Sequence, residues 1–217
     1  MLNVLILGET GTGKELVADI IRNTVYYSKK YLSKEGPYGH AINAAAIPDS
    51  LVDSELFGYV KGAFTGATEN KQGLIEASDD ACLFIDEIAE LPLTSQAKLL
   101  RTIETGTIRR VGENQERKVK VRYIGATNKN LEEEIKAGRF RADLYHRLNY
   151  VTIETSALRT LKEDDKISIA IEDFDDDEKD MFRSNYPEDL PLQRILRHDF
   201  SGNIRELNAA ILRYCLL

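Results

Sequence analysis

The sequence lacks an uninterrupted apolar run of about 18 residues, the length that a helix needs to cross a bilayer. It also has few residues that bind metals or form disulfides. Its two cysteines, Cys82 and Cys215, lie far apart, and its three histidines share no metal-ligand spacing with each other or with the cysteines. These scarcities predict a reduced, cytoplasmic protein without a metal cluster built from side chains.

Positive charge is also in short supply. The formal net charge is −7, because 36 acidic residues outnumber 29 lysines and arginines. A broad basic face that would hold nucleic acid unaided is therefore not expected. The first residues, "MLNVLILGET", have an apolar stretch but no basic segment before it and no small-residue cleavage site after it. We interpret them as a strand rather than as a signal peptide.

The sequence does contain a regular alternation of apolar strands and helical patterns. With 217 residues, 42% of them hydrophobic, the chain can bury the core of one domain with a small appendage. Strands are expected at residues 2–8, 41–47, 82–88, 119–128 and 150–155, and helices at residues 15–25, 49–57, about 94–104, 131–137 and 141–149. This alternation predicts an α/β fold with a parallel sheet covered on both faces.

The composition changes after about Ser156. Residues 172–180, "EDFDDDEKD", form an acidic block, which we interpret as a solvated turn or helix face. The chain then ends in a predicted helix whose apolar side chains share one face: Ile204, Leu207, Ile211 and Tyr214. We therefore predict an α/β subdomain at residues 1–156 and a smaller helical subdomain at residues 157–217.

The segment "GETGTGKE", Gly8 to Glu15, follows the first strand and opens a helix. Glycines let a backbone wrap closely around phosphates, and successive N–H groups at a helix N-terminus form an anion cradle. Lys14 supplies a positive charge for the β- and γ-phosphates. The P-loop pattern ends in Ser or Thr as a magnesium ligand, and here that position holds Glu15. The competing interpretation is an ordinary glycine-rich turn.

Two later strands end in polar residues suited to phosphate chemistry. "LFIDEI" delivers Asp86 and Glu87 to the edge where open parallel sheets bind ligands. Asp86 can hold Mg²⁺ directly or through water, and Glu87 can polarise an attacking water. "GATN" places Thr127 and Asn128 at the same edge, where an amide can orient water or sense the γ-phosphate. For Asn128, a helix cap for the segment from residue 131 onward is the alternative.

Six motifs in this order resemble the AAA+ domain of bacterial enhancer-binding proteins, the activators of sigma-54 RNA polymerase. They are "GETGTGKE", "SELFGYVKGAFTGA", "LFIDEI", "GATN", "FRADLYHRLN" and "GNIREL". The resemblance runs from Leu2 to about Thr155 and resumes at Phe200, and the P-loop of this family also ends in Glu. It implies a P-loop NTPase of the AAA+ class. Such a domain has a five-stranded parallel sheet sandwiched by helices and a small C-terminal helical lid.

The resemblance implies roles for matched residues in an ATPase that uses ATP and Mg²⁺. The implied ATP-binding residues are Gly8, Glu9, Thr10, Gly11, Thr12, Gly13, Lys14, Glu15 and Arg205, the last as the second sensor. The implied catalytic residues are Asp86, Glu87, Asn43, Thr127, Asn128, Arg141 and Arg147. Within this set Asn43 is expected to pair with Glu87 and relay the nucleotide state. Arg141 and Arg147 are expected to reach the ATP of a neighbouring subunit, which implies a ring, a hexamer by family analogy. Without the resemblance they are helix-surface arginines beside an aspartate.

The loop "GAFTGA" marks this branch of AAA+ proteins, and the resemblance assigns it to sigma-54 contact: Gly62, Ala63, Phe64, Thr65, Gly66 and Ala67. A nucleotide-driven loop of this kind would remodel the sigma-54 RNA polymerase holoenzyme. A buried structural Phe64 is the alternative. A second loop at residues 106–118 is expected to support the first by contacting it or promoter DNA, or else to be an exposed hairpin.

Several features depart from the family pattern. "FSGN", Phe200 to Asn203, stands where the family usually has "WPGN", and residues 156–200 match poorly. The chain begins at the first strand, and no helix-turn-helix follows the lid, so we expect neither a complete adenine pocket nor DNA binding within it. Two alternatives to a sigma-54 activator stay open. One is a nucleotide-binding regulatory module with weak or no hydrolysis, and the other is an AAA+ ATPase that serves another partner.

Overall fold

The computed structural model describes residues 2–30, 39–170, 172 and 198–215. These residues form two compact units. The first contains residues 1–7 and 15–154, and the second contains residues 8–14 and 155–217. The loop at residues 8–14 thus groups with the C-terminal residues, whereas the sequence placed it in the α/β subdomain. The division between residues 156 and 157 stays a prediction. The acidic block lies outside the described residues except for Glu172.

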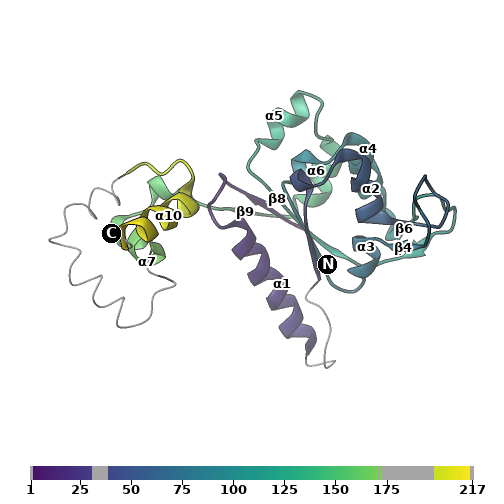
Figure 1. Cartoon of the computed structure of the whole chain (residues 1–217), viewed down its shortest axis with the longest axis horizontal. Coiled ribbons are helices and arrows are strands. Elements are labelled where there is room, and N and C mark those ends of the chain that lie inside the picture. Colours follow the sequence, from purple (N-terminus) through teal and green to yellow (C-terminus); the bar gives the residue numbers. More distant parts are fainter. Residues whose placement is uncertain (1, 31–38, 171, 173–197, 216–217) are drawn as a thin grey trace. The chain divides into compact units, whose positions relative to one another are not determined.

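The first unit is built on a five-stranded parallel sheet in the order β2-β5-β8-β1-β9. Its strands are β1 (Val4–Leu7), β2 (His40–Asn43), β5 (Cys82–Asp86), β8 (Arg122–Thr127) and β9 (Val151–Glu154). Two of these strands, β8 and β9, are labelled in Figure 1. The predicted five-stranded parallel sheet is confirmed. The second strand is shorter than expected: it ends at Asn43, whose side chain accepts a hydrogen bond from the Ala45 N–H and starts the 3₁₀ turn η1 (Ala44–Ala46).

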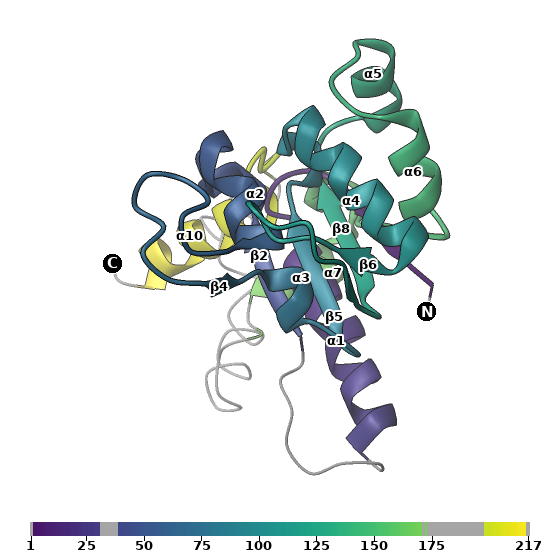
Figure 2. The ribbon, with the colours of Figure 1, turned by 90° about the vertical axis from the view of Figure 1, so that its right-hand side faces the viewer.

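Helices cover both faces of the sheet, as the continuous apolar strands require. They are α1 (Lys14–Lys30), α2 (Asp49–Phe57), α3 (Leu74–Ala77), α4 (Leu93–Thr105), α5 (Leu131–Lys136) and α6 (Ala142–Leu148), with the 3₁₀ turn η2 (Ile88–Glu90). Helix α4 packs against α6 (Figure 2). Two short hairpins are also present: β3 (Gly58–Tyr59) with β4 (Lys71–Gln72), and β6 (Thr107–Ile108) with β7 (Arg117–Lys118). The first was not predicted, and the second is the hairpin that the sequence left open as an alternative for residues 106–118. Strands of two residues carry too little periodicity to be recognised in a sequence.

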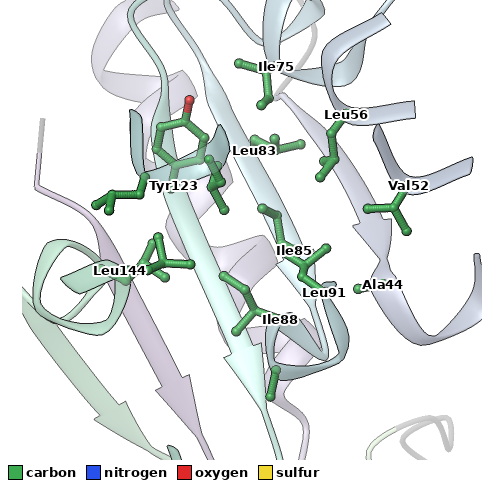
Figure 3. Packing of buried hydrophobic residues seen from close by; sticks show 14 of the residues in the cluster. Ala44, Val52, Leu56, Ile75, Leu83, Ile85, Ile88, Leu91, Tyr123 and Leu144 are labelled. Carbon is green, nitrogen blue, oxygen red and sulfur yellow. The ribbon is translucent and has the colours of Figure 1, made fainter. Parts of the chain in front are cut away.

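The alternation of side chains along β5 divides the core into two layers. Leu83 and Ile85 point to the face covered by α2, α3, α4 and α6, where they pack with Leu56 and Ile75 (Figure 3). Phe84 points to the opposite face, which α1 covers. All five side chains are at most 2% exposed. At about 25 cal/mol per Å² of buried apolar surface, this sandwich supplies the main force that holds the strand ends in fixed positions.

The described part of the second unit is helical after the loop at residues 8–14. It contains η3 (Leu158–Thr160), α7 (Glu163–Ala170) and α10 (Asn203–Cys215). The predicted C-terminal helix is confirmed, and two residues of its apolar face, Leu207 and Ile211, are buried. The Tyr214 side chain lies outside the described residues. No helix in the described part of the chain is long and apolar enough to cross a membrane.

Candidate functional site

The P-loop, residues 8–14, joins β1 to α1 in the chain. Gly11 and Gly13 have φ values of 79° and 85°, a left-handed conformation that favours glycine. The Lys14 side chain is buried, and its ammonium donates to the carbonyl oxygens of Gly8 and Glu9, both at 3.0 Å. The Thr12 hydroxyl donates to the Glu9 carbonyl at 2.8 Å. The loop therefore curls around its own lysine.

The loop has no room for larger side chains at two of its glycines. A Cβ added at Gly8 would lie 1.9 Å from Oγ1 of Thr155, and one at Gly11 would lie 2.3 Å from the carbonyl oxygen of Gly202. At Gly11, therefore, only a residue without a side chain fits beside the neighbouring backbone. A buried lysine in a glycine-rich loop at a helix N-terminus fits a polyphosphate. Glu15 and Thr10 are exposed.

The Glu9 side chain points to the C-terminal residues of the same unit. Its carboxylate accepts hydrogen bonds from Arg159 at 2.7 and 2.5 Å and from Nδ2 of Asn203 at 3.2 Å. These two donors, Arg159 first, lower the pKa of Glu9 from its usual 4.5 to about 2. Arg205, two residues into α10, is exposed. The Arg159 partner was missed from the sequence, because nothing local links residue 9 to residue 159.

In the first unit, the carboxyl ends of β2 and β5 bring two predicted residues together. The parallel register pairs Asn43 with Asp86, and Nδ2 of Asn43 donates to Oδ2 of Asp86 at 2.9 Å. The expected partner of Asn43 was Glu87, and the observed one is Asp86. The reason is the register, which sets Asn43 beside the last residue of β5, whereas Glu87 already lies beyond the strand.

Glu87 adopts the left-handed conformation, with φ 48° and ψ 48°. This turn directs its carboxylate to the end of β8, where it accepts hydrogen bonds from Oγ1 of Thr127 at 3.3 Å and from the Asn128 N–H at 3.2 Å. A left-handed glutamate costs on the order of 1 kcal/mol and often marks a functional position. Asn128 does not cap α5, because Asn130 does so by accepting from the N–H groups of Glu132 and Glu133. The helix-cap alternative for Asn128 is therefore wrong.

The two predicted intersubunit arginines lie on or beside α6. Arg141 donates through Nε and Nη2 to the two carboxylate oxygens of Asp143, at 3.0 and 2.7 Å. Arg147 donates through Nε to Glu104 at 3.1 Å. Both arginine side chains are more than 40% exposed, so solvent screens these pairs and keeps them weak.

The loop at residues 62–67 closes the hairpin between β3 and β4. Its backbone is held by a bond from the Gly62 N–H to the Ala67 carbonyl at 2.9 Å. Phe64 is 43% exposed, and its ring lies edge-on to Tyr59 with a centroid separation of 5.0 Å. A buried structural Phe64 is therefore wrong. Gly62 and Gly66 have left-handed φ values, and a Cβ at either would meet open space, so backbone conformation alone favours glycine there.

The second loop supports the first through its backbone. Val111 donates to the Gly58 carbonyl at 2.8 Å and accepts from the Val60 N–H at 3.1 Å. A Cβ at Gly112 would lie 2.7 Å from Cβ of Ala63. The predicted contact between the two loops is present, on a hairpin formed by β6 and β7. The expected contact with promoter DNA stays a prediction.

Comparison with known protein families identifies the family of this chain. The sigma-54 interaction domain family matches residues 1–154. The chain belongs to this family.

Two proteins related to this sigma-54 interaction domain carry informative names. The anaerobic nitric oxide reductase transcription regulator NorR of Escherichia fergusonii is 46% identical over all 217 residues, which make up 42% of its own length. The same regulator from Escherichia coli O1:K1 is 45% identical over the same share. The chain thus spans less than half the length of the curated relatives it matches.

Solved structures give the same result for the fold. NtrX from Brucella abortus superimposes with a TM-score of 0.78 at 30% identity, over 99% of this chain and 47% of that protein. NtrX crystals in complex with ADP and with ATP give TM-scores of 0.78 and 0.76, each over 45% of that chain. The predicted P-loop NTPase fold of the AAA+ class is confirmed.

Proposed function

We propose that this sigma-54 interaction domain hydrolyses ATP and uses the cycle to remodel the sigma-54 RNA polymerase holoenzyme. The observation that carries the proposal is the gathering of Asp86, Glu87 and Thr127 at the carboxyl ends of β5 and β8. In open parallel sheets this edge is where ligands bind. The neighbouring strand β1 leads directly into the P-loop. The NtrX complexes with ADP and ATP support a nucleotide as the substrate.

The P-loop would bind the phosphates. Lys14 would exchange its bonds to the Gly8 and Glu9 carbonyls for bonds to the β- and γ-phosphates, and the backbone N–H groups from residue 9 onward would complete the cradle. Arg205 would add a second positive charge from α10 as the second sensor. A guanidinium suits this position because it presents several donors in a fixed plane.

Asp86 would hold Mg²⁺, directly or through water. A carboxylate at a strand end, oriented by the Asn43 amide at 2.9 Å, is the hard oxygen donor that this ion prefers. An ion held there would supply positive charge that offsets the charge of the phosphates.

Glu87 would polarise the attacking water, and Thr127 with Asn128 would set the direction of its carboxylate. Asn43 would report the nucleotide state through its neighbour Asp86. Arg141 and Arg147 would leave Asp143 and Glu104 and stabilise the charge that develops on the phosphoryl group in an adjacent subunit. Such an active site is complete only in an oligomer, which we propose to be a hexameric ring in the cytoplasm.

The loop at residues 62–67 would contact sigma-54 and transmit the conformational change that ATP hydrolysis drives. Phe64 is an exposed aromatic on a glycine-flanked turn, a position that favours contact with another protein. The loop at residues 106–118 would brace it through Val111. The proposal needs no DNA-binding or membrane-spanning element within this chain.

Measuring phosphate release from ATP, with Glu87→Ala as the inactive comparison, tests the enzymatic part. We expect Glu87→Ala to lower turnover by about 10²- to 10⁴-fold while ATP still binds, because general-base help is lost without loss of the P-loop. Glu132→Ala, an exposed glutamate on α5, is the matched control and should leave turnover unchanged. ATP binding without phosphate release in the unaltered protein would instead favour a regulatory nucleotide-binding module.

Capture of sigma-54 in the presence of a transition-state mimic of ATP tests the partner. We expect a complex with the mimic and none without nucleotide. Turnover of ATP without any such complex would point to an AAA+ ATPase that serves a different partner.

A further inference from the structure

An ionic network fastens the P-loop to residues near the C-terminus, and the proposed hydrolysis makes no use of it. Arg159, in η3, donates from both terminal nitrogens to the Glu9 carboxylate, and Asn203, at the start of α10, donates to the same group. All three residues belong to one compact unit. In the sequence, Glu9 lies 150 positions from Arg159 and 194 positions from Asn203.

Asn203 forms side-chain hydrogen bonds both with the P-loop and with the segment at Leu158. Its side chain is fully buried and its φ of 54° is left-handed. Nδ2 also donates to the Thr10 carbonyl at 3.0 Å, while Oδ1 accepts from the Leu158 N–H at 2.7 Å. The next N–H, of Ile204, donates to the Gly11 carbonyl at 3.0 Å. Two carbonyl groups of the P-loop are thus held by consecutive residues of α10.

The charge on Glu9 makes this network more than a structural tie. A bare carboxylate beside an anion cradle would repel a polyphosphate. Arg159 neutralises that charge with two hydrogen bonds in a fork geometry, which is the strongest form of such a pair. Because the pKa of Glu9 lies at about 2, the carboxylate stays ionised and paired at neutral pH.

We propose that Arg159 and Asn203 are positioning residues of the phosphate-binding loop: they cancel the charge of Glu9 and hold the loop backbone in its curled shape. Glu9 then acts on the loop and makes no contact with the nucleotide, although the family resemblance had assigned it to ATP binding. The inference rests on the proposed nucleotide binding for its effect on affinity. The fastening itself does not depend on a nucleotide.

Two measurements separate these parts. Amide hydrogen exchange of residues 10–13 without nucleotide reports the fastening, and titration with a fluorescent ATP analogue reports the affinity. We expect Arg159→Ala to speed exchange in the loop by about tenfold and to weaken analogue binding by about tenfold, since hydrogen bonds to a charged group are lost. The variant Arg159→Lys keeps the positive charge but loses the two-bond fork. Its loop exchange rate and its analogue affinity should lie between those of the unaltered protein and of Arg159→Ala.

The double variant Glu9→Gln with Arg159→Ala decides whether charge matters. We expect it to regain most of the lost affinity, because no bare carboxylate remains, although the loop still exchanges fast. Arg139→Ala is the control, because Arg139 forms a similar two-bond pair with Glu134 in the other unit. It should leave both readouts unchanged.

Two results would each contradict one part of this inference, and a third would contradict only the proposed function. Unchanged loop exchange in a folded Arg159→Ala protein would overturn the fastening. A double variant that binds as weakly as Arg159→Ala would overturn the role of charge. Fast exchange in Arg159→Ala together with no analogue binding by the unaltered protein would support the fastening and sink the proposed ATPase function.

Discussion

Single residues in this domain adopt unusual conformations where the proposed chemistry needs them. Glu87 is one of three non-glycine residues with positive φ in the described chain, and Asn203 is another. Each turns its side chain toward groups that no neighbour in sequence supplies: Glu87 toward the end of β8, and Asn203 toward the P-loop. Strain of this kind persists only where the surrounding structure holds it in place.

Phe64 gives a direct prediction at this scale. Its ring is 43% exposed and touches Tyr59 only edge-on, so Phe64→Ala should cost little stability, about 1 kcal/mol or less. We expect ATP turnover to stay largely intact and capture of sigma-54 to be lost. Phosphate release and the capture assay on the same preparation check this. Equal loss of both activities would mean that Phe64 serves the fold.

Glu9 predicts a pH dependence of stability. Its pKa falls from 4.5 in the unfolded chain to about 2 in the folded one, so the stabilisation is complete above pH 4.5 and is lost as the pH falls toward 2. The difference in Tm between the unaltered protein and Glu9→Gln should therefore be positive at pH 7 and shrink below pH 4.5. Thermal melts followed by circular dichroism at several pH values measure it. A difference that stays constant with pH would show that the Arg159 pair does not shift the Glu9 pKa.

At the scale of elements, backbone contacts join the β3–β4 hairpin, which carries the loop at residues 62–67, to the loop at residues 106–118. Backbone hydrogen bonds that Val111 forms with Gly58 and Val60 make the second loop a brace for the first. The sequence did not decide whether the two loops touch, because it does not fix the direction in which the loop at residues 106–118 projects. The structure decides it through an isolated bridge between Tyr59, at the end of β3, and Val111, beyond the end of β6.

Gly112→Val tests the brace. Its Cβ would lie 2.7 Å from Cβ of Ala63, so the valine should displace the loop at residues 62–67. We expect sigma-54 capture to fall by about tenfold or more while ATP turnover persists. Gly138→Val is the matched control, because Gly138 also has a positive φ, 71°, but faces open space. Equal effects of the two variants would attribute the loss to backbone strain instead of loop displacement.

At the scale of the whole molecule, the proposed active site crosses a subunit boundary. Turnover per subunit should therefore rise with protein concentration, and Arg147→Ala should lower it by about 10³-fold. Full turnover by a dilute monomer would rule out the ring. Sedimentation measured under the assay conditions reports the oligomer.

Mixing two inactive variants gives the sharper result. An Arg147→Ala subunit keeps Glu87, and a Glu87→Ala subunit keeps Arg147, so in a head-to-tail ring their shared boundary rebuilds a complete site. Equal amounts mixed at random should restore about a quarter of the sites. No recovery in mixed oligomers would show that Arg147 acts within its own subunit.

The sequence by itself determined the order and type of the main elements and most of the candidate residues. Apolar runs and helical spacing are local, so β5, α4 and β8 were predictable to within a few residues. The motifs carry their chemistry in residue types at fixed spacing, which is why Lys14, Asp86 and Glu87 could be named as candidates from the sequence.

Only the tertiary structure decided which of these residues touch. The register between β2 and β5 makes Asp86 the hydrogen-bond partner of Asn43, whereas Glu87 accepts a hydrogen bond from Asn128 just beyond the end of β8. The link from Glu9 to Arg159 spans 150 positions and leaves no trace in either segment. Pairings of this kind depend on how strands align and where loops return. These are set by burial of the whole core, and no local pattern encodes them.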